Sequence, residues 1–474
     1  MNNIWDTVKL LFPLNRSITG KTNQRTFDFI KKSFIPELEV KRIKSGSKVF
    51  DWEVPKEWNI RDAYVKNKFG KKIIDFSNSN LHVVNYSTPF KGKIEKKEDL
   101  LKHVHFLEKQ PNWVPYRTTY YSDYWGFCTT KELITSKEFI GPFDVLIDSE
   151  FKTDGELIWA EALKVGKLKD EILISTYCCH PSLANDNLSG LVTSLYLFNY
   201  LKSIETKYTY RLVIVPETIG AIGFLASSNI EKIIGGMIIS CTGGPDKFSI
   251  KDSFDKSHWM NITAHQALKT FTKQDYITYP FSPDGSDERQ YSSPAFRIVT
   301  PSIHKSKYYE YPEYHTSADN LDFIKKDYLD QSIEVYKLWI NLIETYKSDN
   351  KNSFIKKDNH IKKQFIKQPD FCTPKRIQMA CEYQLGRRNL YPNLGGTIRQ
   401  PVHLKNLTGH ENRNFKLLDQ IQIKGHHLEA FSWLMHLADG TNSNYEISKK
   451  SGIKLTIINE AIKLFYQNKL IDLK

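Results

Sequence analysis

Four polar residues stand where predicted strands of this chain end. His180 follows the apolar run 171–179, and Asp186 comes six residues after it, directly before a predicted helix. Glu217 ends the next buried run, and His315 lies in a loop far downstream. Because open α/β sheets bind ligands just beyond the carboxyl ends of their strands, we expect these side chains to converge on one site.

The chemistry of these four groups is that of a catalytic zinc centre. Imidazole nitrogens and carboxylate oxygens bind zinc at about 2.0–2.2 Å, and catalytic sites leave a fourth position for water. His180, Asp186 and His315 are the candidate ligands. Glu217 is then available to take a proton from the water and deliver it to a leaving amine. The alternative is structural, since Asp186 could simply cap its helix, and no HExxH motif is present.

Two loops supply candidate substrate contacts. Asp287 and Arg289 lie in the loop FSPDGSDERQYSSP, and Tyr314 directly precedes His315. The planar guanidinium of Arg289 suits a substrate carboxylate, although an ordinary loop salt bridge explains it equally well. The aromatic-rich stretch 110–128 suits a cleft wall or, as the favoured interpretation, the core of its own region.

The six cysteines are too few and too irregularly spaced for a disulfide framework, and no CxxC pair occurs. Reduced thiols are therefore expected. Cys178 and Cys179 are adjacent in a predicted strand, so their side chains must point to opposite faces. We interpret both as small core residues rather than ligands.

The hydrophobic pattern predicts an α/β fold with an insertion. Residues 1–50 are predicted to be mainly helical, and residues 51–150 form a β-rich insertion of short strands. From residue 151 to 350, apolar runs alternate with helical periodicity, as in a sheet covered by helices. The last of these helices is predicted to begin near Ser317. The predicted α/β domain therefore combines 1–50 with 151–350.

Residues 371–474 restart a compact pattern of three short helices and an apolar edge, compatible with a winged helix-turn-helix. The net charge of +13 is concentrated in the last quarter of the chain, because the residues from Lys351 onward include 21 Lys and Arg against 10 Asp and Glu. This excess suits a nucleic-acid contact or, as the alternative, a Lys-rich solvated face.

Composition and length exclude several classes of protein. With 40% hydrophobic and 13% aromatic residues, the 474-residue chain is neither disordered nor collagen-like. No apolar run approaches the roughly 20 residues of a membrane-spanning helix. The N-terminus lacks the features of a signal peptide. We therefore expect a cytoplasmic protein without a membrane span.

Six motifs spread over nearly the whole chain are distinctive, namely CHPSLANDNLSG, PETIGAIGF, GSDERQY, PEYHTSADN, PNWVPYRTTYYSDYWGF and CEYQLGRRNLYPNLGG. They resemble those of the bacterial polysaccharide-biosynthesis proteins with an aminopeptidase-like domain, relatives of zinc aminopeptidases and glutaminyl cyclases. The resemblance implies a zinc-exopeptidase-like mixed sheet flanked by helices, a protease-associated-like insertion and a C-terminal winged helix. It implies metal-ligand roles for His180, Asp186 and His315, and the general-base role for Glu217.

Two positions depart from the wider di-zinc aminopeptidases that the family resembles. Thr218 stands where those enzymes usually have a second, metal-binding Glu, and Cys241 stands near their usual Asp ligand. One zinc ion held by His180, Asp186 and His315 is therefore expected. A thiolate ligand from Cys241 would allow a second.

The predicted function is zinc-dependent, aminopeptidase-like hydrolysis of an amide bond in a peptide or an amino-acylated sugar related to surface polysaccharide. The alternative is a catalytically degenerate regulatory protein that senses a metabolite and binds DNA through the winged helix. The sequence leaves open whether the chain forms a homo-oligomer.

Overall fold

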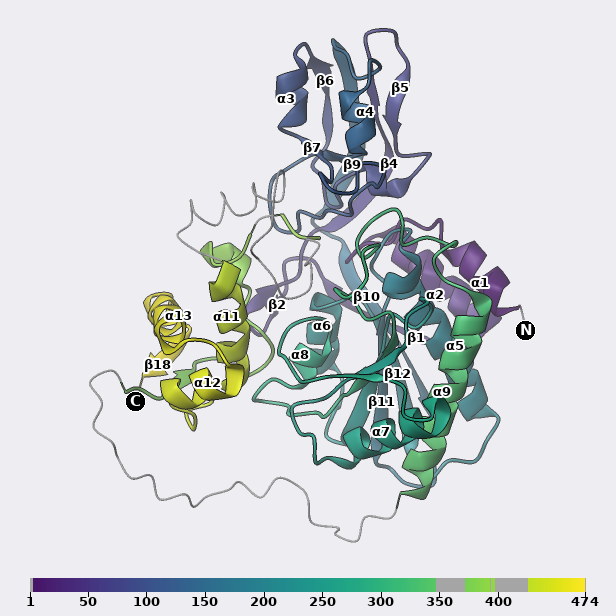
Figure 1. Ribbon diagram of the computed structural model, residues 1–474, viewed down its shortest axis with the longest axis vertical. Helices are drawn as coiled ribbons and strands as arrows, with labels where there is room; N and C mark the ends of the chain where they lie inside the picture. The colour runs from purple at the N-terminus through teal and green to yellow at the C-terminus, as the bar shows by residue number, and fades with distance from the viewer. Residues whose placement is uncertain (1–2, 347–370, 393, 397–424, 474) are drawn as a thin grey trace.

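The computed structural model describes residues 3–346, 371–392, 394–396 and 425–473 (Figure 1). An eight-stranded mixed sheet forms its centre, in the order β1-β10-β12-β11-β13-β16-β14-β15. Its strands are β1 (Glu39–Lys44), β10 (Glu156–Lys164), β11 (Glu171–Tyr177), β12 (Thr209–Val215), β13 (Ile233–Ile239), β14 (Phe248–Lys251), β15 (Ile277–Tyr279) and β16 (Ser302–Lys305).

Strands β12, β11, β13 and β16 run parallel in the middle of this sheet, and helices cover both of its faces. Every residue of β11 is buried, because Ile172 and Ile174 pack into one core cluster and Leu173 into the other. The predicted α/β fold with a mixed sheet is therefore confirmed. The helices are α1 (Ile4–Leu11), α2 (Lys21–Ser33), α5 (Gly190–Lys202), α7 (Trp259–Thr272) and α9 (Lys326–Thr345) on the first face, and α6 (Ile219–Ser227) and α8 (Glu288–Tyr291) on the second.

Two sequence predictions about these elements were wrong. The segment 1–50 is not mainly helical, since β1 pairs with β10 at the sheet edge and β2 (Lys48–Val49) pairs with β3 (Trp52–Glu53). The charged residues of β1, which suit an exposed edge strand, conceal the strand pattern. Helix α9 begins at Lys326 rather than near Ser317. The residues before it form a loop whose Asp319 accepts backbone hydrogen bonds from a distant turn.

A second, four-stranded sheet lies above the main sheet in Figure 1, in the order β5-β4-β9-β6. It has its own buried core, to which Val65, Phe127 and Val145 belong. From this region Tyr116 returns to the main sheet, where its backbone N–H donates to the carbonyl of His315 at 2.8 Å. The elements are β4 (Glu57–Lys66), β5 (Lys72–Asp75), η1 (Asn80–His82), β6 (Phe90–Ile94), α3 (Lys97–Leu101), β7 (Val104–His105), β8 (Phe127–Cys128), α4 (Lys131–Thr135) and β9 (Phe143–Lys152).

Three helices and a short antiparallel strand pair form the C-terminal part around a separate core. Ser443 and Glu446 make a reciprocal capping box at the start of α12, and Gly452 ends that helix with φ 72°. The elements are β17 (Pro374–Arg376), η3 (Leu385–Arg388), α11 (Gly425–Leu437), α12 (Asn444–Ser451), α13 (Leu455–Gln467) and β18 (Ile471–Leu473). Within the ranges described above, no helix is both long and apolar enough to cross a membrane.

Candidate metal centre

The turn between β11 and α5 carries two of the predicted ligands. His180 follows the end of β11, and Asp186 lies in the helical turn η2 (Ala184–Ser189). The side chain of Asn187 fastens this turn by donating to the carbonyl of Tyr177 and accepting from the backbone N–H of Cys241. The turn therefore places both side chains at the carboxyl ends of the central strands, as the sequence predicted.

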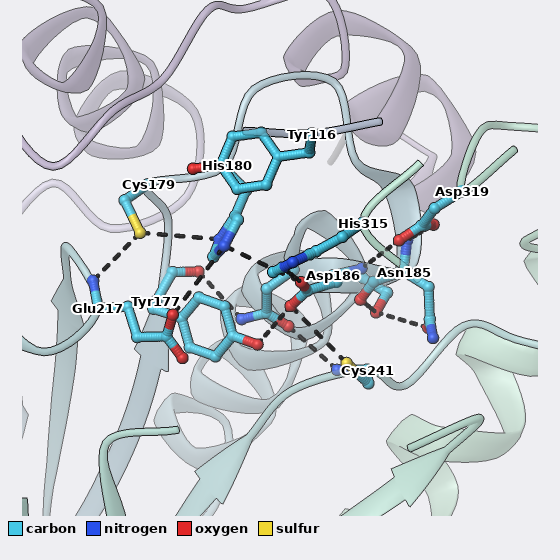
Figure 2. Close-up of polar contacts among 12 residues, drawn as sticks. Tyr116, Tyr177, Cys179, His180, Asn185, Asp186, Glu217, Cys241, His315 and Asp319 are labelled. Carbon is cyan, nitrogen blue, oxygen red and sulfur yellow. Dashed lines mark hydrogen bonds and ion pairs between the residues drawn. The ribbon is translucent and has the colours of Figure 1, made fainter. Parts of the chain in front are cut away.

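His315 joins them from the loop before α9 (Figure 2). Its Nε2 lies 2.9 Å from Asp186 Oδ2, and His180 Nε2 lies 3.9 Å from the same oxygen. The ligand atoms of the three residues all lie within 4.8 Å of one another. In the described chain, the buried Nδ1 of His315 has no hydrogen-bond partner, and Asp186 Oδ2 makes no hydrogen bond to any group other than the two histidines. Two imidazoles and one carboxylate with unused donor atoms fit a zinc ion.

Surrounding groups orient the Asp186 carboxylate. The Tyr177 hydroxyl donates to Oδ1 at 2.5 Å, which leaves Oδ2 facing the histidines. Asp319 accepts the backbone N–H groups of Asn185 and Asp186 at 2.6 and 3.0 Å. Burial opposes ionisation of Asp186, but His180, His315 and Tyr177 together lower its pKa to about 2. Burial lowers the pKa of His180 to about 4, so this imidazole is neutral at pH 7, as a ligand must be.

Two tyrosines wall the histidine pair. The ring of Tyr116 lies edge-on to His180 and His315, with centroid separations of 5.3 and 5.1 Å. Tyr314 stacks on His315 at 3.9 Å. Tyr314, a predicted substrate contact, therefore lies beside the three candidate ligands. We interpreted the aromatic residues of 110–128 mainly as core. Tyr116 is indeed buried, but its ring also faces the candidate site.

Glu217 enters the site from the end of β12. Its Oε2 lies 4.0 Å from His180 Nε2. Thr218, the next residue, has φ 66° and ψ −80°, and the N–H of Ile219 donates to the carbonyl of Glu217 at 2.9 Å. This is a tight γ-turn in a strained region of backbone space, and such turns persist only where neighbouring groups hold them.

Asp287 and Arg289 are those neighbouring groups. Asp287 Oδ1 accepts the Thr218 N–H at 2.7 Å, and Arg289 Nη2 donates to Thr218 Oγ1 at 2.6 Å. Arg289 Nη1 also lies 3.4 Å from a carboxylate oxygen of Glu382, which comes from the C-terminal part. Asp287 and Arg289, the two predicted substrate contacts, therefore lie at the site. Their hydrogen bonds to Thr218 hold the turn that carries Glu217.

The electrostatics around Glu217 favour proton uptake. Burial is the largest cause that raises the pKa of Glu217 well above its ordinary value, and the charges of Asp287 and Asp186 raise it further, while Arg289 opposes them. These charges favour the protonated carboxyl group, whereas the positive charge of a zinc ion bound nearby would lower the pKa of Glu217 again and so leave it ionised to act as a base.

Cys241 is buried near the cluster but outside it. Its Sγ lies 3.9 Å from Asp186 Oδ1, the oxygen that already accepts from Tyr177. Among the described residues, the potential ligand groups are His180, Asp186, His315 and, separately, Cys179, His180, Glu217. The three residues expected to bind one zinc ion therefore lie together, and Cys241 is not part of either potential ligand group.

The sequence reasoning missed three residues that organise the site, namely Tyr177, Asp319 and Glu382. Tyr177 and Asp319 lie next to or within the quoted motifs, so proximity to a ligand was an available signal. Glu382 lies within the quoted motif CEYQLGRRNLYPNLGG, but it is remote in sequence from Arg289, and nothing in the motif indicates that the two side chains meet. These residues act through other side chains and become visible only in three dimensions.

Replacing Tyr177 by Phe is expected to weaken zinc binding about 10- to 100-fold, because the hydroxyl that orients Asp186 is lost. Competition with a chromophoric chelator measures the dissociation constant. Tyr291→Phe is the matched control, since the buried Tyr291 hydroxyl also makes a side-chain hydrogen bond, but to Ser175 of β11 and away from the cluster. Equal zinc affinity of Tyr177→Phe and wild type would show that the hydroxyl does not orient a ligand.

The fold and the site together define a mixed α/β protein with a candidate zinc centre at the carboxyl ends of its parallel strands. The family model described as "Domain of unknown function (DUF4910)" matches residues 5–346. A Clostridium acetobutylicum relative is 35% identical over 472 residues, which is 99% of this chain and 96% of the relative. That relative is named "Putative polysaccharide biosynthesis protein with aminopeptidase-like domain". The chain belongs to this family.

Solved structures extend the likeness. A C. acetobutylicum protein described as a putative peptidase matches with TM-score 0.69 and 33% identity, covering 99% of this chain and 96% of its own. The zinc aminopeptidase BSAP of Bacillus subtilis matches with TM-score 0.53 and 11% identity over 74% of this chain and 96% of its own. A peptidase M28 precursor of Shewanella amazonensis matches with TM-score 0.51 and 12% identity, covering 73% of this chain and 94% of its own. At 11% and 12% identity, the B. subtilis and S. amazonensis structures show only that this chain shares their fold.

Proposed function

We propose that this protein is a zinc-dependent, aminopeptidase-like hydrolase of amide bonds. The observation that carries the proposal is the meeting of His180, Asp186 and His315 in one buried cluster, with Glu217 4.0 Å from His180. The zinc aminopeptidase and peptidase names among its structural neighbours support the same class. When bound by the three ligands, zinc supplies a Lewis acid that polarises the substrate carbonyl and lowers the pKa of water.

Glu217 is proposed to move the proton. As the water oxygen bonds to the carbonyl carbon, Glu217 takes one water proton, and it returns that proton to the nitrogen as the C–N bond breaks. The products are a carboxylic acid and an amine, which become a carboxylate and an ammonium ion when the second water proton passes to the amine. Asp287 and Arg289 hold the Thr218 turn and so keep the Glu217 carboxylate next to the cluster.

The substrate is proposed to be a peptide or an amino-acylated sugar that lies against Tyr314, with Arg289 and Asp287 near its polar end. Within the described chain, Arg289 Nε and Asp287 Oδ2 are buried without hydrogen-bond partners, which supports a polar contact there. The link to surface polysaccharide rests on the name of the C. acetobutylicum relative.

We also propose a division of the chain into three domains. Residues 1–50 with 151–350 would form the hydrolase domain, 51–150 a protease-associated-like insertion and 371–474 a winged helix-turn-helix. The three C-terminal helices and the β17–β18 pair support the last assignment. All six cysteines are free thiols, which supports a reducing compartment such as the cytoplasm.

The described contacts of the C-terminal part give no support for the DNA-binding alternative. Asp439 pairs with Arg297 at 3.3 Å, and the rings of Trp433 and His436 contact Phe281. These contacts join α11 and the turn after it to the main sheet region. We therefore propose that this part completes the enzyme, with Glu382 reaching Arg289.

Removal of zinc tests the proposed function. Protein purified without a metal-binding tag and loaded with one zinc equivalent is expected to hydrolyse members of a panel of aminoacyl-aminomethylcoumarins and amino-acylated amino sugars. Dialysis against 1,10-phenanthroline should abolish this activity and one zinc equivalent should restore it, because the polarising ion is essential to the proposed chemistry. Activity that is unchanged in metal-free protein would contradict the proposal, as would a zinc-loaded protein inert on the whole panel.

A further inference from the structure

A cavity of about 250 Å³ lies at the β14–β15 end of the main sheet, between these strands and the loops before β14 and after β16. Within the described chain, none of its lining residues belongs to a group of potential metal ligands. Phe248 and Ile250 pack into the core cluster of α5 and α9, so Ser249 between them faces the opposite side of the sheet, where the cavity lies. At about 30 Å³ for each water molecule, the space suits a ligand of roughly ten non-hydrogen atoms.

Lys307 and Ser249 bring buried polar groups to this cavity. The side chain of Lys307 is 8% exposed, and its Nζ lies 4.8 Å from the ring centroid of Tyr279, another lining residue. An ammonium group has three protons to donate, and in the described chain Nζ makes one hydrogen bond, to the Tyr308 carbonyl at 3.1 Å. Ser249 Oγ is buried without a hydrogen-bond partner among the same residues. Because buried polar groups are normally paired, these two indicate a ligand that accepts hydrogen bonds.

Two carboxylates share the cavity with Lys307. A carboxylate oxygen of Glu310 lies 3.6 Å from Lys307 Nζ, which is longer than the roughly 2.7–2.9 Å of a charge-assisted hydrogen bond. Burial raises the pKa of Tyr279, and the charges of Glu310 and Asp246 raise it further, so both carboxylates lie near this ring. The cavity therefore combines one buried ammonium group with two carboxylates.

These charges discriminate between classes of ligand. The other lining cation, Lys247, pairs with Asp275 at 2.6 Å, so Lys307 is the lining cation left for a ligand. Glu310 and Asp246 would repel a simple anion, and Lys307 would repel a simple cation. A molecule with both charges is attracted by all three groups. The ammonium and carboxylate of an α-amino acid are joined through one carbon atom, which matches the close spacing of Lys307 and Glu310.

We propose that this cavity binds a free α-amino acid with an apolar side chain. Lys307 and the Ser249 hydroxyl donate hydrogen bonds to its carboxylate, and Glu310 and Asp246 accept hydrogen bonds from its ammonium group. Its side chain lies against Ile277, which is 43% exposed and lines the same cavity. The site uses no group of the candidate metal centre, so it does not rest on the proposed hydrolase function.

Isothermal titration calorimetry of the zinc-loaded wild type tests the ligand class. L-leucine and L-phenylalanine should each bind with one equivalent. N-acetyl-L-leucine keeps the carboxylate but has no ammonium group, and L-leucinamide keeps the ammonium group but has no carboxylate. Each should bind about 10- to 100-fold more weakly than L-leucine, because one charged hydrogen-bonding group is lost. These titrations depend on the folding of no variant.

Lys307→Met tests the location of the site. It keeps most of the apolar chain, removes the charge and should weaken L-leucine binding about 10- to 100-fold. Lys337→Met is the matched control, because Lys337 also pairs with a glutamate three residues away, Glu334, and lies over a tyrosine ring, that of Tyr200, but outside the cavity. It should bind L-leucine like wild type. Ser249→Ala should weaken binding about 2- to 10-fold, the effect of one neutral hydrogen bond.

Asp186→Asn separates this cavity from the candidate metal centre, because an amino acid can also bind a zinc ion. L-leucine should bind Asp186→Asn as tightly as wild type. Binding that is lost in Asp186→Asn and kept in Lys307→Met would place the ligand at the metal centre and overturn the proposal. Equal affinity of wild type for L-leucine, N-acetyl-L-leucine and L-leucinamide would also overturn it, as would a wild type that binds neither L-leucine nor L-phenylalanine.

Discussion

Glu217→Gln is expected to lower kcat by about 10²- to 10⁴-fold, the range typical of a lost general base. Glutamine has nearly the size of glutamate, so the Thr218 turn and its bonds to Asp287 and Arg289 can persist. The amide cannot take a proton from water at neutral pH. KM should change much less than kcat, because the substrate binding surfaces stay in place.

Steady-state kinetics at one zinc equivalent, with metal content measured on the same sample, check this expectation. Glu313→Gln is the matched control, because it makes the same chemical change in the loop that precedes His315 without touching the described ligand clusters. Wild-type kcat in a zinc-loaded Glu217→Gln protein would remove Glu217 from the mechanism. Loss of the zinc ion would instead show that Glu217 is one of its ligands.

The central sheet was the most predictable part of the fold. Apolar runs that fill β11, β12 and β13 have no polar face, and only strands covered by helices on both sides can bury them. The edge of the sheet was not predictable in this way. In β1, Val40 and Ile43 are three residues apart, which is the apolar spacing of a helix rather than the alternation of a strand. Its strand structure depends on pairing with β10, which lies more than a hundred residues away.

The candidate ligands were predictable because the fold itself brings strand ends together. His180, Asp186 and Glu217 each lie within a short turn of a central strand, so a correct sheet order is almost sufficient to place them. His315 was predicted only as a residue of suitable type in a loop before a helix, and the family resemblance implied the same role. Its loop follows the short strand β16, which the sequence pattern did not reveal. It reaches the site because the following Asp319 is bonded to the Asp186 turn.

The groups that position the ligands depend on long-range packing. Tyr116 belongs to the β-rich region and faces the histidines only because its backbone bonds to His315. Glu382 reaches Arg289 from the C-terminal part, outside the 5–346 range of the family model. The roles assigned to Asp287 and Arg289 illustrate the same limit. The sequence predicted that both belong to the site, but whether they hold the Thr218 turn or the substrate is a question of geometry.

Asp186→Asn is expected to abolish tight zinc binding, and with it hydrolysis. The charged Oδ2, which lies 2.9 Å from His315 and 3.9 Å from His180, is the only anionic donor of the proposed ligand set. An amide group in its place is a much weaker zinc ligand, and two imidazoles alone bind the ion poorly. Asparagine keeps the volume of the side chain and can still accept the Tyr177 hydroxyl, so the turn should fold.

The zinc dependence of thermal stability separates loss of the metal from loss of the fold. A ligand that binds only the folded state stabilises it by about 2.7 kcal/mol at roughly 100 times its dissociation constant. Wild type and the exposed control Asp322→Asn should therefore show a rise in Tm with added zinc, and Asp186→Asn should show none. If Asp186→Asn kept the wild-type zinc stoichiometry and Tm response, the zinc ion would be bound elsewhere. Since Glu217 would then have no polarised carbonyl beside it, the proposed mechanism would fail together with the site.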